Sequence, residues 1–225
     1  MKIEAAKPCV VSTKCLPDWA QNDIEQAGFS LFQHDFIATA AIAVEWGVIH
    51  EFLVFTSQQA VQYYVKQNSA KRPCFCVGQQ TSNLLQKLGF EVVAMAFSAQ
   101  YLGELLQVKY YNGSFTFVCG VQRRPELPYM LDQMAVTWNQ YPIYETIATP
   151  VEAPNNPSAV LFFSPSAVAS FQEKNALYPE TPYFCVGATT AQSLREVGSF
   201  QIYIADKPDT KVLINLLIQH LKTAC

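Results

Sequence analysis

The sequence has little charge. Only 15% of its 225 residues are charged, and the formal net charge is −3, whereas average proteins carry roughly 25% charged residues. Lys and Arg stand mostly alone, apart from the pairs at 71–72 and 123–124, which argues against a basic surface for nucleic acid. No apolar run has the length of a membrane span, and the N-terminus lacks the apolar core of a signal peptide. We therefore expect a cytoplasmic protein that binds neither nucleic acid nor membrane.

Familiar catalytic motifs are also missing. The sequence contains no GxGxxG, GxxxxGK[ST], GxSxG or HExxH, so the usual signals for nucleotide binding, triad hydrolysis and zinc proteases are absent. The three histidines are scattered, and the seven cysteines are odd in number. Cys74 and Cys76 have no second pair or nearby His that would complete a zinc site. We expect reduced, mostly buried thiols and no metal.

Half of the residues are hydrophobic, enough for a large core, and they are arranged in an internal repeat. Four pairs of segments recur along the chain. They are VFTSQQAV (54–61) with LFFSPSAV (161–168), FCVGQQT (75–81) with FCVGATT (184–190), VVSTKCLPDW (10–19) with FVCGVQRRPEL (117–127), and QHDFIAT (33–39) with QYPIYET (140–146). The chain therefore reads as two copies of one unit.

Short apolar runs alternate with helical patterns throughout both copies. This alternation is typical of parallel sheets covered by helices on both faces, so we predict a doubly wound α/β fold. After a helix at 125–133, we expect a short strand at 134–138.

The repeated motifs fall where strands lead into helices. Ser57 and Ser164 occupy helix N-cap positions, and Gly78 and Gly187 permit tight turns. Thr81, Thr189 and Thr190 lie in the first helical turn that follows. Free N–H groups at such helix starts attract anions. The same residue types also serve simply to start helices, and the pattern alone leaves both roles open.

These motifs, in this order, resemble the uroporphyrinogen-III synthase family over nearly the whole chain. The resemblance implies two flavodoxin-like lobes joined by a two-stranded linker, here about 33–39 and 140–149. One lobe would comprise 1–34 plus 147–225, and the other 35–146. A simple tandem cut near residue 110 stays open, because periodicity cannot distinguish the two divisions.

The resemblance also implies an activity. Members of the family close the linear tetrapyrrole hydroxymethylbilane to uroporphyrinogen III, with loss of water and inversion of ring D, in haem biosynthesis. The expected ligand is a small-molecule polycarboxylate, held in a cleft lined by helix N-termini, and no cofactor is needed. We expect a monomeric hydro-lyase.

The family's site residues can be placed on this sequence by resemblance. Tyr144 matches the tyrosine that assists departure of the substrate hydroxyl, although it could simply pack as a linker aromatic. Lys14 stands where the family usually has an arginine, so the charge is kept but the bidentate fork is lost. The other predicted substrate-binding residues are Ser57, Gly78, Thr81, Arg123, Arg124, Ser164, Ser166, Gly187, Thr189 and Thr190.

Two other functions stay open. Lys14 and the glutamines of VGQQT suit a catalytically inactive descendant that binds a tetrapyrrole or another polyanion. The two-copy pattern alone also fits a two-lobed small-molecule sensor, although the missing export signal argues against one.

Overall fold

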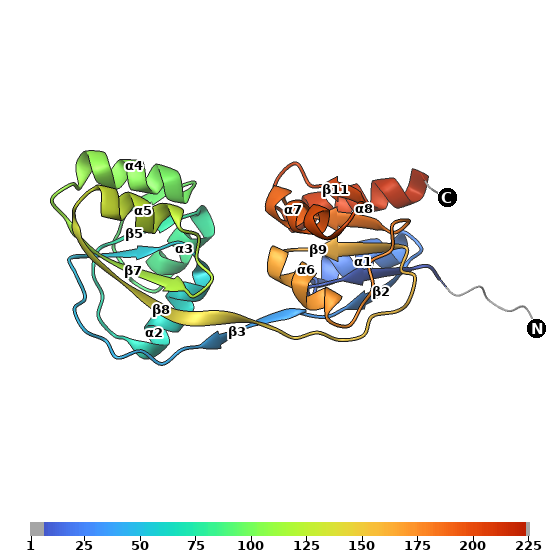
Figure 1. Ribbon diagram of the computed structural model, residues 1–225, viewed down its shortest axis with the longest axis horizontal. Helices are drawn as coiled ribbons and strands as arrows, with labels where there is room; N and C mark the ends of the chain where they lie inside the picture. The colour runs from blue at the N-terminus through green and yellow to red at the C-terminus, as the bar shows by residue number, and fades with distance from the viewer. Residues whose placement is uncertain (1–6, 224–225) are drawn as a thin grey trace, which may run out of the picture. The chain divides into compact units, whose positions relative to one another are not determined.

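The computed structural model describes residues 7–223, which form two compact units (Figure 1). Unit 1 contains the chain up to Ala38 and again from Ile147, and unit 2 is Thr39–Thr146. Each unit is built on its own mainly parallel β-sheet. The chain therefore has a mixed α/β fold, as its alternating pattern predicts.

The sheet of unit 1 has the strand order β11-β10-β9-β1-β2, and all its neighbouring pairs are parallel. Its strands are β1 (Cys9–Ser12), β2 (Ser30–Gln33), β9 (Ala159–Phe162), β10 (Pro182–Cys185) and β11 (Gln201–Ile204). Its helices are α1 (Asp18–Gln26), α6 (Pro165–Gln172), α7 (Ala188–Val197) and α8 (Thr210–Thr223). The sequence did not reveal β2 as a strand of its own.

Adjacent residues of the unit 1 strands pack into different cores, because side chains alternate between the faces of a sheet. Val10 belongs to a cluster that includes residues of α1 and α8. Its neighbour Val11 belongs to a second cluster, with residues of α6 and α7. The sheet is therefore covered on both faces, as doubly wound folds require.

The sheet of unit 2 has the order β3-β8-β7-β4-β5-β6. Its strands are β3 (Ile37–Ala41), β4 (Phe52–Phe55), β5 (Cys74–Val77), β6 (Val92–Ala96), β7 (Ser114–Gly120) and β8 (Thr137–Ala148). Its helices are α2 (Gln58–Gln67), α3 (Gln79–Lys87), α4 (Ala99–Lys109) and α5 (Glu126–Gln133). Backbone hydrogen bonds from Ile42 to Ile143 and from Thr149 to Phe36 show that β3 runs antiparallel to β8.

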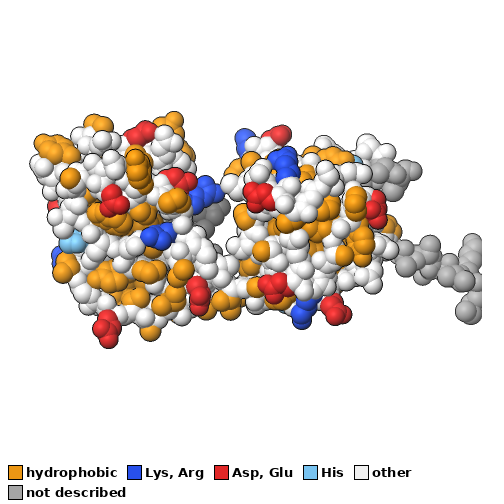
Figure 2. All heavy atoms as spheres, in the orientation of Figure 1, with side chains coloured by type: hydrophobic (Ala, Val, Ile, Leu, Met, Phe, Trp, Pro, Cys, Tyr) orange, Lys and Arg blue, Asp and Glu red, His pale blue; other side chains and the backbone are white. Residues whose placement is uncertain are grey.

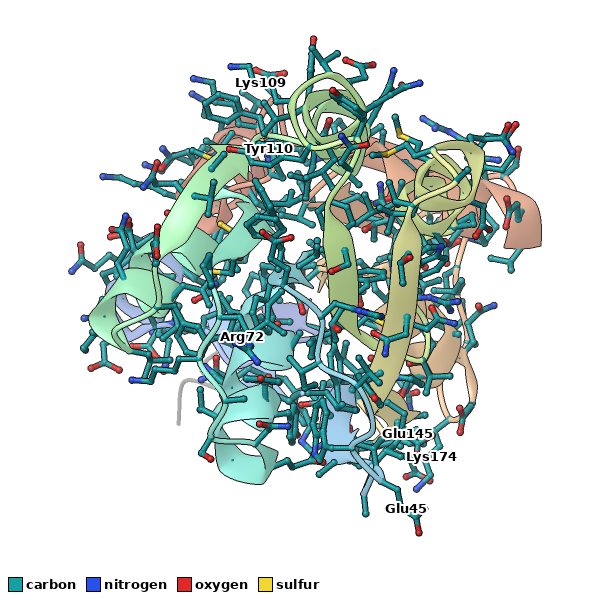
Figure 3. The ribbon with its side chains drawn as sticks, turned by 90° about the vertical axis from the view of Figure 1, so that its left-hand side faces the viewer. Glu45, Arg72, Lys109, Tyr110, Glu145 and Lys174 are labelled. Atoms are coloured by element: carbon teal, nitrogen blue, oxygen red, sulfur yellow. The ribbon has the colours of Figure 1, made fainter. Side chains whose placement is uncertain are left out.

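Unit 2 also has a core on each face of its sheet. Leu53 of β4 packs with α2 and α3, whereas Val54 packs with α4 and α5. Tyr110, which follows α4 and is labelled in Figure 3, brings its ring centroid within 4.7 Å of that of Phe75. This contact fixes the end of α4 against the sheet.

The region after α5 differs from its prediction. Instead of a strand at 134–138 followed by separate linker residues, a single strand, β8, runs from Thr137 to Ala148. Ala135 has a φ of 53°, a left-handed conformation that separates α5 from β8. The sequence pattern misses this continuity because β8 is mostly half-buried and has no continuous apolar run.

Four cysteines lie in the strands and are buried, whereas Cys15 is exposed. Burial raises the pKa of Cys74 and of Cys185 to about 12, so both thiols stay protonated at neutral pH. In the described residues, no helix is long and apolar enough to cross a membrane. On the face drawn in Figure 2, Lys and Arg are scattered in small groups.

Candidate functional site

The carboxyl edge of the unit 2 sheet contains a pocket of about 460 Å³. Its walls come from the ends of β4, β5, β6 and β7, from the start of α4, and from β8. The residues that line it are Thr56, Val77, Phe97, Ser98, Ala99, Phe117, Gly120, Gln122, Arg123, Arg124, Leu127 and Tyr144. Ligands of parallel α/β sheets bind at this edge, so the pocket is the candidate functional site.

Tyr144 is the ionisable phenol of this pocket. Its hydroxyl lies 3.0 Å from Ser57 Oγ, and either group can donate the hydrogen bond. Ser57 is the N-cap of α2, and its Oγ accepts a hydrogen bond from the backbone N–H of Ala60 at 3.1 Å. Burial raises the pKa of Tyr144, an effect that the hydrogen bond to Ser57 partly offsets. The phenol therefore stays protonated at neutral pH and can donate a proton.

The backbone of two strands sets the place of the Tyr144 ring. Cys119 lies opposite Pro142 and Gly120 lies opposite Tyr144, so β8 has one extra residue between these pairs. Such a bulge re-aims the side chains that follow it. A Cβ atom on Gly120 would lie only 2.7 Å from Cζ of Tyr144. The ring can take this position only because residue 120 has no side chain.

Tyr144 also packs on an aromatic neighbour. The rings of Tyr63 and Tyr144 are stacked, with centroids 5.5 Å apart and an interplanar angle of 13°. The hydroxyl of Tyr63 donates to the carbonyl oxygen of Thr39 at 2.7 Å, which fixes the ring of Tyr63. Together with Ser57 and Gly120, this contact holds the phenol in one orientation.

Arg123 and Arg124 bring positive charge to the same pocket. The Nε atom of Arg123 is buried and has no hydrogen-bond partner among residues 7–223. A buried donor without a partner is costly in free energy, and a bound anion would satisfy it. The two arginines follow β7 in the chain, and the predicted cations line the same pocket as Tyr144.

Gly78 and Thr81 start α3, next to the end of β5. Gly78 has a φ of 84°, a conformation that favours glycine, and it forms the N-cap of α3 without a side-chain bond. Thr81 is buried in the first turn. Val77 is the residue of this junction that lines the pocket, so the structure does not bring Gly78 or Thr81 into its wall.

In unit 1, the predicted residues occupy the equivalent strand ends. Ser164 caps α6, where its Oγ accepts a hydrogen bond from the backbone N–H of Ala167 at 3.1 Å, and Ser166 is exposed in the first turn. Lys14 is exposed beyond β1, with its Nζ 5.8 Å from the ring centroid of Phe163. In α7, Thr189 is exposed and Thr190 is buried.

The structure differs from the sequence prediction at Gly187, where a tight turn is expected. Its φ of −171° and ψ of 170° are extended backbone that any residue adopts. The tight turn expected from the repeated CVG motif is therefore present at Gly78 and absent at Gly187. The two copies of this motif begin their helices differently.

Sequence reasoning missed Gly120 and Phe97. Gly120 ends FVCG, and nothing in that string signals a contact with a residue on the neighbouring strand. Phe97 is an aromatic residue immediately before the Ser98 N-cap of α4, but its counterpart region in the second copy matches only weakly. Gly120 is identified by the register of β7 and β8, and Phe97 by its place in the pocket wall.

Two mainly parallel sheets with helices on both faces, and a pocket with apolar, hydroxyl and arginine side chains at a carboxyl edge, are typical of a ligand-binding α/β protein. The chain belongs to the uroporphyrinogen-III synthase family, since the family model described as uroporphyrinogen-III synthase HemD matches residues 29–215. Members of this family are hydro-lyases of tetrapyrrole biosynthesis. No curated protein shows a significant sequence match to the chain.

Solved structures of two organisms share the fold. The crystal structure of uroporphyrinogen-III synthetase from Helicobacter pylori is 19% identical and has a TM-score of 0.72, with 95% of this chain and 99% of that one covered. A mutant uroporphyrinogen III synthase from Thermus thermophilus is 17% identical and has a TM-score of 0.65, with 98% of each chain covered. At these identities the likeness concerns the fold.

Proposed function

We propose that this chain closes hydroxymethylbilane to uroporphyrinogen III, with Tyr144 as the general acid. The observation that carries the proposal is that Tyr144, a protonated phenol whose hydroxyl lies 3.0 Å from Ser57 Oγ, lines a pocket together with two arginines. Family membership supports the choice of substrate. The pocket supplies the two chemical groups that the reaction requires, a proton donor and cations for carboxylates.

In the proposed first step, the phenol proton of Tyr144 passes to the substrate hydroxyl. The C–O bond breaks, water leaves with the electron pair, and the bilane becomes an azafulvene cation. The substituted α-carbon of ring D attacks the cationic methylene carbon and forms a spiro intermediate. The older bond between that α-carbon and the methylene bridge to ring C then breaks, which leaves a second azafulvene cation at this bridge. The unsubstituted α-carbon of ring D bonds to the bridge carbon, so ring D is inverted. The proton lost from ring D on final closure restores the phenol, so only water is released overall.

The carboxylates of the substrate need several donors. In unit 2 we assign this role to Arg123, Arg124 and Ser57, and also to the start of α3 at Gly78 and Thr81, which lies outside the pocket wall but directly follows the lining residue Val77. In unit 1 we assign it to the predicted helix-start and strand-end residues, which are Lys14, Ser164, Ser166, Gly187, Thr189 and Thr190. Helix N-termini attract anions locally, which suits a protein whose own net charge is −3.

We also propose that each unit is a flavodoxin-like lobe. Counted in chain order within unit 1, the strand order is 2-1-3-4-5, which is the flavodoxin order. In unit 2, β8-β7-β4-β5-β6 has the same order if β7 is counted first. The lobes would be 1–34 plus 147–225 and 35–146, with the linker in the β3 and β8 segments. A monomeric state and a cytoplasmic location complete the proposal.

Product analysis tests the function. Purified protein is incubated with hydroxymethylbilane, and the two uroporphyrinogen isomers are separated by chromatography after oxidation. We expect mainly the type III isomer, formed faster than spontaneous closure. Type I alone, at the rate without enzyme, would contradict the proposal.

The replacement of the expected arginine by Lys14 favours one alternative, an inactive descendant that binds tetrapyrroles. Titration with uroporphyrinogen III separates the two. Tight binding without isomer selectivity would identify the descendant, whereas binding together with type III formation identifies the enzyme.

A further inference from the structure

Phe97 is exposed to an unusual degree. It follows β6 and precedes Ser98, the N-cap of α4. The residue is 85% exposed, which makes it the most exposed of the large hydrophobic residues in the described chain. A phenyl ring in this state contributes little to the core, so its removal should cost the fold little. Exposure of a single ring is common on protein surfaces, and it is the place of Phe97 in the pocket that sets it apart.

The surroundings of Phe97 indicate a ligand. It lines the 460 Å³ pocket together with Arg123 and Tyr144. The pocket volume lies within the range of about 300–1,000 Å³ that is typical of small-molecule sites. Since Nε of Arg123 is buried without a partner among residues 7–223, the pocket offers an aromatic face and an unused cationic donor.

We propose that one pyrrole ring of the substrate stacks on Phe97 while a carboxylate of the same ring binds Arg123. This inference rests on the proposed function and adds a specificity determinant to it. Pyrroles are electron-rich aromatic rings, which pack well on a phenyl face. The N–H groups of an arginine recognise carboxylates through charge-assisted hydrogen bonds.

The pair would make the pocket selective for carboxylated aromatic rings over other polyanions. Arg123 and Arg124 alone would attract any anion, because their attraction depends only on charge. A requirement for Phe97 adds a condition that citrate or a polyphosphate cannot meet. Phe97 would thus distinguish a tetrapyrrole from an arbitrary polycarboxylate.

Tyr101 provides a matched control. It lies in the first turn of α4, four residues after Phe97, it is 66% exposed, and it does not line the pocket. Removing either ring should leave the fold intact, since both are largely outside the core. Only removal of Phe97 should weaken binding of the substrate.

The experiment compares Phe97→Ala, Phe97→Tyr and Tyr101→Ala with the wild-type chain. We expect Phe97→Ala to raise KM for hydroxymethylbilane about five- to ten-fold, the scale of one aromatic contact, with kcat changed less than two-fold. Phe97→Tyr should retain the wild-type KM because it keeps the ring. An unchanged KM in Phe97→Ala, or an equal rise in Tyr101→Ala, would overturn the inference.

A second measurement separates this inference from the proposed function. Calorimetry with porphobilinogen, a single pyrrole that carries one acetate and one propionate, needs no turnover. We expect weak binding that is lost in Phe97→Ala and retained in Tyr101→Ala. If the wild type forms the type III isomer but Phe97→Ala binds hydroxymethylbilane and porphobilinogen as the wild type does, only the inference about Phe97 fails. If the wild type forms no type III isomer, the proposed function itself is rejected.

Discussion

The carboxyl edge of unit 2 holds a phenol, two arginines and a pocket of about 460 Å³, whereas that of unit 1 holds hydroxyls and exposed lysines, among them Lys14. Unit 1 has smaller pockets. One of about 270 Å³ is lined mainly by the loops that lead into β9 and β10, at the amino edge of the sheet, together with Phe171 of α6. Another, of about 180 Å³, lies at the end of β11 and is lined by Ile204, Asp206 and residues of α8. Two sheets with matching strand order have thus come to differ at the edge where ligands bind.

The capping serines show how this difference arises. Ser57 and Ser164 make the same 3.1 Å bond to a backbone N–H of the helix that each begins. Only Ser57 also contacts a phenol, because β8 carries Tyr144 past the end of β4. The matching segment of unit 1, QHDFIAT, contains no tyrosine. The two serines therefore share the capping contact, and only Ser57 adds a contact with a phenol.

The proposed difference between the two carboxyl edges depends most strongly on Tyr144. Tyr144→Phe should lower kcat about 100-fold, because general acid catalysis contributes at least that much, while the fold stays intact. Steady-state kinetics and circular dichroism measure the two effects. Tyr63→Phe is the control, since it keeps the ring that stacks on Tyr144 and removes only the hydroxyl bonded to Thr39, so it should change kcat only slightly. An unchanged rate in Tyr144→Phe would remove this residue from the mechanism.

The two CVG motifs allow a sharper test of the backbone. At both Gly78 and Gly187, an added Cβ meets no atom within 4 Å, so only backbone conformation differs. Gly78→Ala should lower the free energy of unfolding by about 2 kcal/mol, because its φ of 84° disfavours a side chain. Gly187→Ala should leave the stability of the protein nearly unchanged. Denaturant titration measures both, and equal losses would refute the distinction.

Substitution of the capping serines should have the smallest effects. It should also distinguish a loss of stability, expected in both variants, from a loss of kcat, expected in one. Ser57→Ala and Ser164→Ala should each cost about 1 kcal/mol of unfolding free energy through loss of the N-cap bond. Ser57→Ala should in addition lower kcat about ten-fold, since Tyr144 loses a hydrogen bond that orients it. Ser164→Ala should act on KM instead. A fall in kcat in both variants would contradict the assignment of the acid to unit 2 alone.

Much of the fold could be predicted because the apolar strands and their helix starts are local signals. The buried runs at 53–55, 74–76 and 159–162 read directly as strands of a covered sheet. The pairing of β8 with β7 could not be predicted in detail, since the bulge after Pro142 depends on which residues lie opposite one another. The contact of Gly120 with Tyr144 follows from that register.

The sequence repeat does not predict which residues lie opposite one another on neighbouring strands. Matching VVST with FVCG and QHDFIAT with QYPIYET would place Ser12 opposite Asp35, since Cys119 lies opposite Pro142. In the structure, Ser12 lies opposite Gln33. A shift by two residues keeps every side chain on its own face of the sheet, so the hydrophobic pattern does not reveal it. The identity of Tyr144 as a candidate acid therefore came from family resemblance, and its environment came from the structure.

The division of the chain has a consequence for biosynthesis. Unit 2 is one continuous segment, but unit 1 needs residues from both sides of it. Strand β1 pairs with β9, which the ribosome produces only after all of unit 2. Because domains tend to fold as they emerge, unit 2 can complete its sheet before β9 is synthesised. Until then, β1, α1 and β2 lack the central strand of their sheet. The unit that carries the phenol is the one able to fold first.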